Sequence, residues 1–366
     1  MRTLMLVIII LLSTVTTAFG QTPQPTVSAQ NAILIEQSTG RVLFEKNAHD
    51  QRPIASITKI MTAIIAVESG MMDDMTAASR RAIYTEGSSI YLEQGEKMSI
   101  KDLVYGLMLR SGNDAAVAIS EHIGGSVEGF VYLMNEKAKW LGMENTSFKN
   151  PHGLHEENHY SSAYDMAILM RYAMDNDVFR EISGMEMYKA EKRSYAWRNK
   201  NKLLTSYYDA CTGGKTGFTK ISGRTLVSSA QKNKMDLIAV TLNASDDWND
   251  HMGMFEWGFK NFKLHPLINK GENIYEVSGD SVKSKRMKGY ILEDVNYPLM
   301  ATELRNMMKR FEPMYNDEET DILGNEIIYL DGQPIMEVDI FRKGSMDEES
   351  FLSQVMAIYK SVMGLI

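Results

Sequence analysis

The spacing of apolar residues changes along this chain, and the changes constrain its fold more than any other feature. Apolar-rich segments at residues 32–36 and 41–45 flank a polar turn and predict a β-hairpin. Apolar residues then recur every three or four positions, which predicts helices at residues 53–68, 100–109, 115–123, 127–141 and 163–174. Further on, strands are predicted at residues 224–230 and 236–242 and a helix at residues 252–262. Strands at both ends, with helices between and after them, predict an α/β domain in which an antiparallel sheet is flanked by helices.

The pattern changes again near residue 265. Short alternating segments predict a small all-β domain, with strands at residues 273–277, 289–292, 326–330 and 335–341. In the last segment the apolar residues recur on one side of a helical pattern. We therefore expect a main domain at residues 21–264, a β-rich domain at 265–345 and an amphipathic helix at 346–366.

The N-terminus resembles an export signal. Arg2 supplies a positive charge, residues 4–12 are an unbroken apolar run, and small residues at Ala18 and Gly20 precede a cut before Gln21. This is the pattern of a secretory signal peptide at residues 1–20, too short for a comfortable membrane span. The alternative is a retained N-terminal anchor.

Charge and cysteine content narrow the class of protein. The net charge of −8 argues against a nucleic-acid binder, which would show a basic face. Cys211 is the only cysteine, so no intramolecular disulfide is possible. An exported chain without disulfides suggests a bacterial cell envelope.

A serine and a lysine three residues apart interrupt the small, apolar run Pro-Ile-Ala-Ser-Ile-Thr-Lys-Ile-Met-Thr-Ala. On a helix, Ser56 and Lys59 share one face. Apolar neighbours should lower the pKa of Lys59, so that its amine can accept a proton from Ser56 and make it a nucleophile. The N–H of Ser56, at the start of the helix, could point at a developing oxyanion.

Ser-x-x-Lys alone is weak evidence, because short motifs need their structural context. Ser229 and Lys232 match the same pattern. They lie in a predicted strand that runs into a turn, where positions three apart face opposite sides. We expect no function for this second copy.

Two further motifs strengthen the case. Ser111-Gly112-Asn113 lies between two predicted helices and offers a hydroxyl that can relay protons and an amide that can hold a substrate carbonyl. Alone, each motif would also fit a surface turn; together they form an ordered trio in an exported protein.

The third motif, Lys215-Thr216-Gly217, opens a predicted strand. Its lysine and threonine can grip a substrate carboxylate, and Gly217 lets a ligand lie against the strand backbone. The N–H of Phe218 could be a second oxyanion donor.

The sequence resembles the D-alanyl-D-alanine carboxypeptidases, the low-molecular-mass penicillin-binding proteins. The resemblance covers about residues 30–262 and is loose beyond them. It is carried by blocks at residues 32–36, 39–43, 52–62, 105–115, 150–154, 159–163 and 214–219. It implies a penicillin-binding, β-lactamase-like fold with a helical subdomain.

The resemblance also implies a reaction. Ser56 would attack the carbonyl of the penultimate D-alanine in a peptidoglycan stem pentapeptide, with Lys59 as general base. Ser111 would help carry the proton to the leaving D-alanine, and Asn113 would orient the peptide.

For the third motif, the resemblance implies that Lys215 and Thr216 bind the terminal carboxylate. The charge of Lys215 would also help keep Lys59 neutral. Water would cleave the acyl-enzyme, and β-lactams should acylate the same serine. No cofactor is implied, and the histidines show no metal-ligand spacing such as His-Glu-x-x-His.

For four residues near these motifs, the sequence allows a structural explanation beside a functional one or leaves the role open. His152 lies in a histidine-containing loop, where loop packing is favoured over catalysis because Lys59 already serves as base. Cys211 is expected to pack as a small apolar residue. Lys200 could add charge near the substrate carboxylate or be solvated, and we leave it out of the site. Thr212 stands where many relatives have an acidic residue.

Other functions remain open. A class A β-lactamase would need a deacylating glutamate, and the chain has no Glu-x-x-Leu-Asn. A D,D-endopeptidase would use the same machinery, and an inactive wall-binding module would not need it. The C-terminal helix suggests peripheral membrane contact, although its polar face is not basic; packing on the β domain or self-association are the alternatives.

Overall fold

A computed structural model describes residues 23–279, 282–314 and 322–342. The predicted signal peptide and the predicted C-terminal helix lie outside the described residues. Within the described ranges, no helix combines the length and the apolar character needed to cross a membrane.

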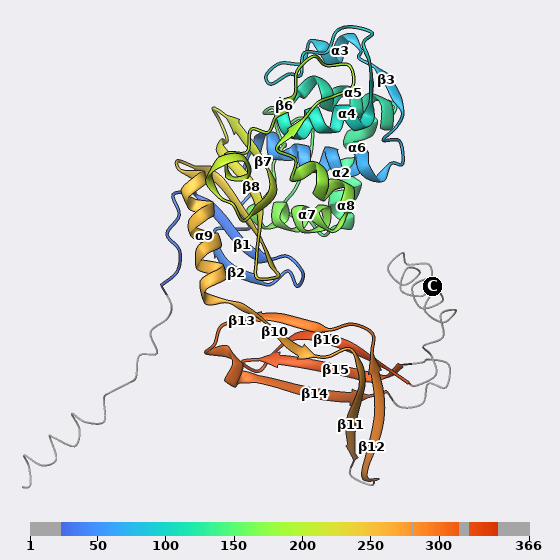
Figure 1. The fold of residues 1–366 in the computed structure, drawn as a ribbon, viewed down its shortest axis with the longest axis vertical. Helices are drawn as coiled ribbons and strands as arrows, with labels where there is room; N and C mark the ends of the chain where they lie inside the picture. Colours follow the sequence, from blue (N-terminus) through green and yellow to red (C-terminus); the bar gives the residue numbers. More distant parts are fainter. Residues whose placement is uncertain (1–22, 280–281, 315–321, 343–366) are drawn as a thin grey trace, which may run out of the picture.

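A five-stranded antiparallel sheet forms the centre of the larger domain (Figure 1). Its order is β2-β1-β9-β8-β7, so the first hairpin pairs with a strand more than 200 residues later. Both predicted hairpins are confirmed. The strands are β1 (Asn31–Glu36), β2 (Val42–Lys46), β7 (Cys211–Thr219), β8 (Gly223–Lys232) and β9 (Met235–Ala244).

The sheet is covered on both faces, which explains why β1 is buried throughout. Ile33 and Ile35 belong to the core shared with the helical subdomain. Ala32 and Leu34 belong to a second core, which packs against α9 (Asp247–Asn261). Because neighbouring strand residues face opposite sides, an unbroken apolar strand is what a two-sided core requires.

The helical subdomain lies on one side of this sheet, around the largely buried α2 (Lys59–Glu68). The predicted helices are present in α2, α4 (Ile100–Tyr105), α5 (Asn113–Ile123), α6 (Val127–Trp140) and α7 (Ala163–Asp175). Not predicted were α3 (Arg80–Ile83), α8 (Asp177–Ser183), β3 (Met75–Ala77), β4 (Lys97–Ser99), β5 (Met187–Tyr188), β6 (Trp197–Arg198) and η3 (Leu203–Tyr207).

The helix predicted at residues 252–262 is α9, which already begins at Asp247 and ends at Asn261. Two other predicted helices also differ from the structure in detail. The first begins as a tight 3₁₀ turn, η1 (Ala55–Thr58), before α2. The second, expected over residues 100–109, ends as α-helix at Tyr105 and continues as the π-helical turn η2 (Gly106–Arg110). Single π turns of this kind occur often at functional sites, and this one leads directly into Ser111.

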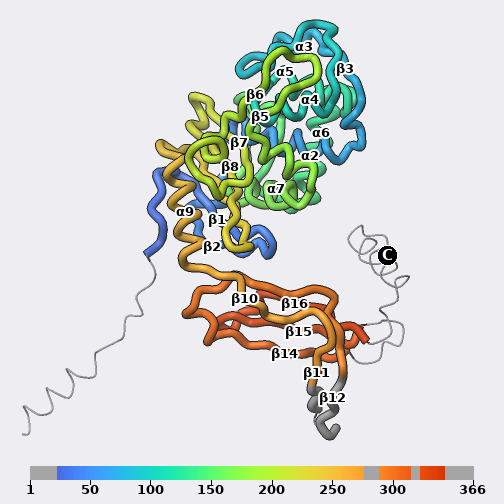
Figure 2. The backbone as a smooth tube through the Cα atoms, in the orientation of Figure 1, coloured from blue at the N-terminus to red at the C-terminus, as the bar shows by residue number. Residues whose placement is uncertain are grey.

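A smaller β domain follows α9 (Figure 2). Its main sheet has the order β11-β12-β16-β15-β14, and β10 pairs with β13. All four predicted segments lie in strands, except that Leu292 follows the end of its strand. The elements are β10 (Lys263–Ile268), β11 (Gly271–Gly279), β12 (Val282–Ile291), β13 (Val295–Leu299), η4 (Glu303–Asn306), β14 (Met307–Pro313), β15 (Ile322–Leu330) and β16 (Gln333–Phe341).

One arginine connects the two domains. The guanidinium of Arg41, beside β2, pairs with Glu303 at 2.5 Å and donates to the carbonyl of Pro298. It also lies 5.3 Å from the ring centre of Phe262 and 5.1 Å from that of Tyr297. Because this ion pair is largely buried, it is screened less than a surface pair and orients the β domain on the first hairpin.

We predict that stability falls with acid partly through His251, which is fully buried on α9. Its ring nitrogens contact the hydroxyls of Ser228 at 2.6 Å and Thr241 at 3.0 Å. Burial lowers the pKa of His251 from 6.5 to about 3. Between these values the unfolded chain binds a proton that the folded chain does not, so the free energy of unfolding decreases as the pH falls from 6.5.

Chemical denaturation at several pH values measures this effect. His251→Gln should show a shallower slope of unfolding free energy against pH between 4 and 6.5. The matched control is His49→Gln, which changes an exposed histidine. NMR titration of the His251 ring in the unmodified protein checks the same point; a midpoint near 6.5 would refute it.

Candidate active site

Ser56 and Lys59 occupy the junction of η1 and α2. The sequence predicted an α-helical first turn for Ser56, whereas the structure places this residue in the 3₁₀ turn. The preceding residue, Ala55, has φ +51°, a left-handed conformation that costs about 1–3 kcal/mol for a residue with a side chain. The turn still brings Lys59 Nζ to 3.0 Å from Ser56 Oγ.

The amine of Lys59 is enclosed by three oxygen atoms. Besides Ser56 Oγ, it contacts the side-chain oxygen of Asn113 at 2.7 Å and the carbonyl of His152 at 2.6 Å. Lys59 is fully buried. Burial is the main cause that lowers its pKa well below 10.5; the charges of Lys215 and Lys200 lower it further.

These contacts determine how a neutral amine would point. The oxygens of Asn113 and His152 can only accept hydrogen bonds, so they take the two N–H groups of a neutral Lys59. The lone pair is then directed at the third neighbour, the Ser56 hydroxyl, which can donate. The site therefore places a proton acceptor in line with a serine proton.

The carbonyl of His152 was not predicted as part of the site. It is presented by the loop at residues 150–160, where Asn150 accepts a hydrogen bond from Gly153 N at 2.7 Å. A Cβ at Gly153 would stand 1.9 Å from the Ala55 carbonyl oxygen, so only glycine allows the loop to approach η1 this closely. No side-chain pattern marks a backbone carbonyl as functional.

The His152 ring is a poor candidate for a base. Its pKa is lowered to about 3, first by burial and then by Lys59, so the ring is neutral. Its Nδ1 accepts from Leu154 N at 3.2 Å. His159, with its pKa lowered to about 4 mainly by burial, instead connects the loop to Thr58 at 2.9 Å. The structure thus favours loop packing for both rings.

Ser111 and Asn113 lie where η2 meets α5. Ser111 has φ +65°, and its side chain faces the pocket. Asn113 is held at both ends of its amide, by Lys59 and by the Glu86 carbonyl at 2.6 Å. In the structure Asn113 thus positions the lysine amine directly.

Strand β7 forms the opposite wall. Lys215 is 1% exposed and donates to the Thr216 carbonyl at 2.8 Å. Its pKa is lowered to about 7 by burial and by Lys200. The side chain of Thr216 lines the pocket, as do Gly217 and Phe218, whereas Lys215 is not among the lining residues.

Gly217 allows β7 to approach the serine. A Cβ at this position would lie 2.4 Å from Thr225 Oγ1 and 2.9 Å from Ser56 N. Thr225 in turn donates to the Ile54 carbonyl at 2.9 Å. The strand backbone is therefore packed against the turn that carries Ser56.

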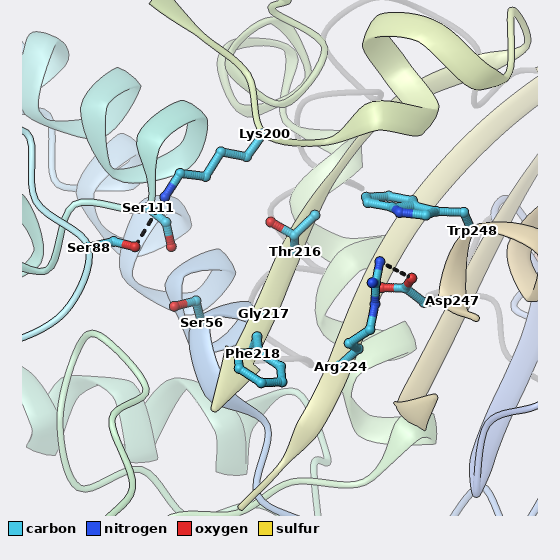
Figure 3. Close-up of a pocket in the computed structure, with 10 residues that line it drawn as sticks. All are labelled: Ser56, Ser88, Ser111, Lys200, Thr216, Gly217, Phe218, Arg224, Asp247 and Trp248. Atoms are coloured by element: carbon cyan, nitrogen blue, oxygen red, sulfur yellow. Dashed lines mark hydrogen bonds and ion pairs between the residues drawn. The ribbon is translucent and has the colours of Figure 1, made fainter. Parts of the chain in front are cut away.

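The pocket has a volume of about 510 Å³ (Figure 3). Ser56, Ser111, Thr216, Gly217 and Phe218 were predicted to belong to a site. Lys200 was left out of the predicted site, and four other lining residues were not predicted: Ser88, Arg224, Asp247 and Trp248.

One wall of the pocket, which was not predicted from the sequence, is built around Arg224. The carboxylate of Asp247 pairs with the Arg224 guanidinium at 2.6 Å. The same guanidinium lies 5.6 Å from the ring centre of Trp248. Arg224 stands opposite Phe218 in the register of β7 and β8. Asp247 and Trp248 begin α9, so only the packing of that helix brings them here.

The structure can be compared with the sequence-based remarks on Cys211, Thr212 and the second Ser-x-x-Lys copy. Cys211 is buried and the pKa of its thiol is raised to about 11, mainly by burial, which fits a packing role. Thr212 donates to Ser229 at 2.8 Å. Lys232 pairs with Glu256 at 2.7 Å on the surface, whereas Ser229 is buried, so the second Ser-x-x-Lys copy forms no site.

Comparisons with known proteins identify the family. A family model described as D-alanyl-D-alanine carboxypeptidase matches residues 18–246. D-alanyl-D-alanine carboxypeptidase DacF of Bacillus subtilis is 36% identical over 341 residues, covering 89% of this chain and 87% of the relative. DacC of Escherichia coli is 36% identical over 253 residues, covering 65% and 63%.

Solved structures show the same fold. Penicillin binding protein 5 from Haemophilus influenzae superposes with a TM-score of 0.75 at 29% identity, covering 88% of this chain and 99% of that one. Penicillin binding protein 6B from Escherichia coli superposes with a TM-score of 0.70 at 25% identity, covering 88% and 98%.

We predict that Gly217→Ala slows acylation of Ser56 by a β-lactam about 100-fold, because the added methyl forces β7 away from the Ser56 N–H. Stopped-flow measurement of the acylation rate constant tests this. Gly253→Ala on α9 is the matched control, since a Cβ there meets no atom within 4 Å. Equal acylation rates in both variants would show that the close approach of β7 is not required.

Proposed function

Because the chain belongs to the D-alanyl-D-alanine carboxypeptidase family, we propose that Ser56 is the acyl-ester nucleophile of a serine-type peptidase. The chain is a hydrolase that removes the terminal D-alanine from peptidoglycan stem pentapeptides. The observation that carries the assignment of Ser56 is the 3.0 Å contact with a buried amine whose other two neighbours are carbonyl oxygens.

In the first half-reaction, Lys59 takes the proton of Ser56 as Oγ attacks the carbonyl carbon of the penultimate D-alanine. The oxyanion that forms accepts hydrogen bonds from the N–H groups of Ser56 and Phe218, and the close packing of Gly217 supports this arrangement. The peptide C–N bond then breaks. The proton on Lys59 passes through Ser111 to the nitrogen of the departing D-alanine.

In the second half-reaction, water attacks the ester carbonyl. Its proton goes to Lys59 and then to Ser56 Oγ as the ester bond breaks, releasing the shortened peptide. β-Lactams mimic the substrate and acylate the same serine.

Substrate binding is assigned to β7. Thr216 lines the pocket and can donate to the terminal carboxylate. Lys215 is buried behind it, so its contribution is electrostatic: when protonated, it attracts the carboxylate and disfavours a second charge on Lys59. Asn113 acts on the substrate through the lysine amine that it positions.

We also propose where this enzyme acts and how its chain is divided into domains. Residues 1–20 direct export to the bacterial cell envelope, and residues 346–366 contact the membrane surface. Residues 21–264 form the catalytic domain and residues 265–345 the β-rich domain. The Arg41 contacts with Glu303 support a fixed arrangement of the two.

We predict that Ser56→Ala abolishes labelling by a fluorescent penicillin and release of D-alanine from a pentapeptide ending in D-Ala-D-Ala, because no acyl-ester can form. Gel fluorescence and a free D-alanine assay measure the two effects, and circular dichroism checks the fold. Ser229→Ala, in the second Ser-x-x-Lys copy, should retain both activities. Continued D-alanine release by Ser56→Ala would exclude this serine as the nucleophile.

A further inference from the structure

A hydrogen bond joins two of the segments that line the pocket, beside Ser111. The ammonium of Lys200 donates to Ser88 Oγ at 3.1 Å, and both residues line the pocket (Figure 3). They come from segments that are 112 residues apart. We call this pair, Lys200 with Ser88, the strap.

Main-chain bonds on either side of Ser111 hold the two ends of the strap. The backbone N–H of Lys200 donates to the Leu109 carbonyl at 3.1 Å. On the other side, the N–H of Asn113 donates to the Ser88 carbonyl at 2.7 Å. The strap therefore spans from the residue two before Ser111 to the residue two after it.

The Ser88 end is rigid because a buried carboxylate organises its loop. Asp114 is 1% exposed. It accepts hydrogen bonds from Ser89 Oγ at 2.6 Å, and from Ile90 N and Leu92 N at 3.1 Å. A charged acceptor with this many donors strongly favours one loop conformation.

The Lys200 end is also fixed. Lys200 lies between Asn199 and Asn201, which are both buried. Asn199 donates to the Met185 carbonyl at 3.0 Å, and Asn201 accepts from Leu203 N at 3.1 Å. The backbone that carries the strap lysine is thus held by neighbours on both sides, and only the long side chain can move.

We propose that the strap limits the size of the leaving residue, so that stem peptides ending in a small D-amino acid are favoured over those with a bulky one. This rests on the proposed function, in which Ser111 passes a proton to the leaving amine and the leaving residue lies beside it. A side chain longer than that of D-alanine would have to displace the Lys200–Ser88 bond. The strap thereby favours carboxypeptidase action over cleavage of cross-links, whose leaving group carries a long side chain.

Two pentapeptides isolate this effect from recognition of the terminal carboxylate. They are identical except for the last residue, which is D-alanine in one and D-norleucine in the other, so both carry the same carboxylate. The measured quantity is the ratio of their kcat/KM values. We expect a clear preference for D-alanine in the unmodified enzyme, and a preference reduced about tenfold in Ser88→Ala and in Lys200→Ala.

Lys202→Ala is the matched control. Lys202 lies two residues further on, and its ammonium lies 5.8 Å from the ring centre of Tyr207; the D-alanine preference should be unchanged. Penicillin labelling of each variant shows separately that Ser56 remains reactive.

The outcomes are distinct. A ratio equal to that of the unmodified enzyme in both strap variants, with labelling intact, would overturn the proposal. So would an equal loss with both peptides in Lys200→Ala, which would assign the lysine to the shared carboxylate. If penicillin does not label the unmodified enzyme, that result would instead contradict the proposed function itself.

Discussion

The burial of one amine is the constraint on which the rest of this structure depends. An ammonium ion removed from water costs several kcal/mol unless partners replace its hydration. The structure surrounds Lys59 with the oxygens of Ser56, Asn113 and His152. None of these three groups carries a negative charge, so burial and the charges of Lys215 and Lys200 favour the neutral amine. These partners lie up to 93 residues from the lysine, so the helical subdomain and its loops must be in place before the amine can be reactive.

Close backbone approaches make this convergence possible. Gly153 allows the His152 loop to contact η1, and Gly217 allows β7 to contact the same turn from the other side. Ala55 is held in a left-handed conformation between them. The strain in that residue is maintained because rigid elements on both sides leave the turn no alternative, which orients Ser56 before any substrate arrives.

Much of the fold follows from local sequence patterns, whereas the pocket wall around Arg224, Asp247 and Trp248 does not. Alternation and helical periodicity identify the hairpins, α2 and α5–α7, because these elements bury one face or both. The start of η1 was read as α-helix because Pro53 fits either helix type. Lys215 was predicted to grip a substrate carboxylate, whereas the structure buries its side chain, which is a tertiary effect.

Ser88, Asp247 and Trp248 were missed because packing of distant segments brings them to the pocket, whereas Arg224 lies opposite Phe218 on the neighbouring strand. Ser88 is placed by the carboxylate of Asp114, and Trp248 by the packing of α9 on the sheet. Lys200 was considered from the sequence but left out of the site, because nothing in the sequence showed that its ammonium lies at the pocket. The His152 carbonyl carried no sequence signal, since every residue has a carbonyl.

The most direct test of this account is the protonation state of Lys59 in the free enzyme. NMR of protein labelled with ¹³C at lysine Cε can follow its titration, with the signal assigned by its absence in Lys59→Arg. We expect a midpoint well below the ordinary lysine value of 10.5, because burial disfavours the charged form of this amine. A signal that titrates near 10.5 together with the exposed lysines would contradict it.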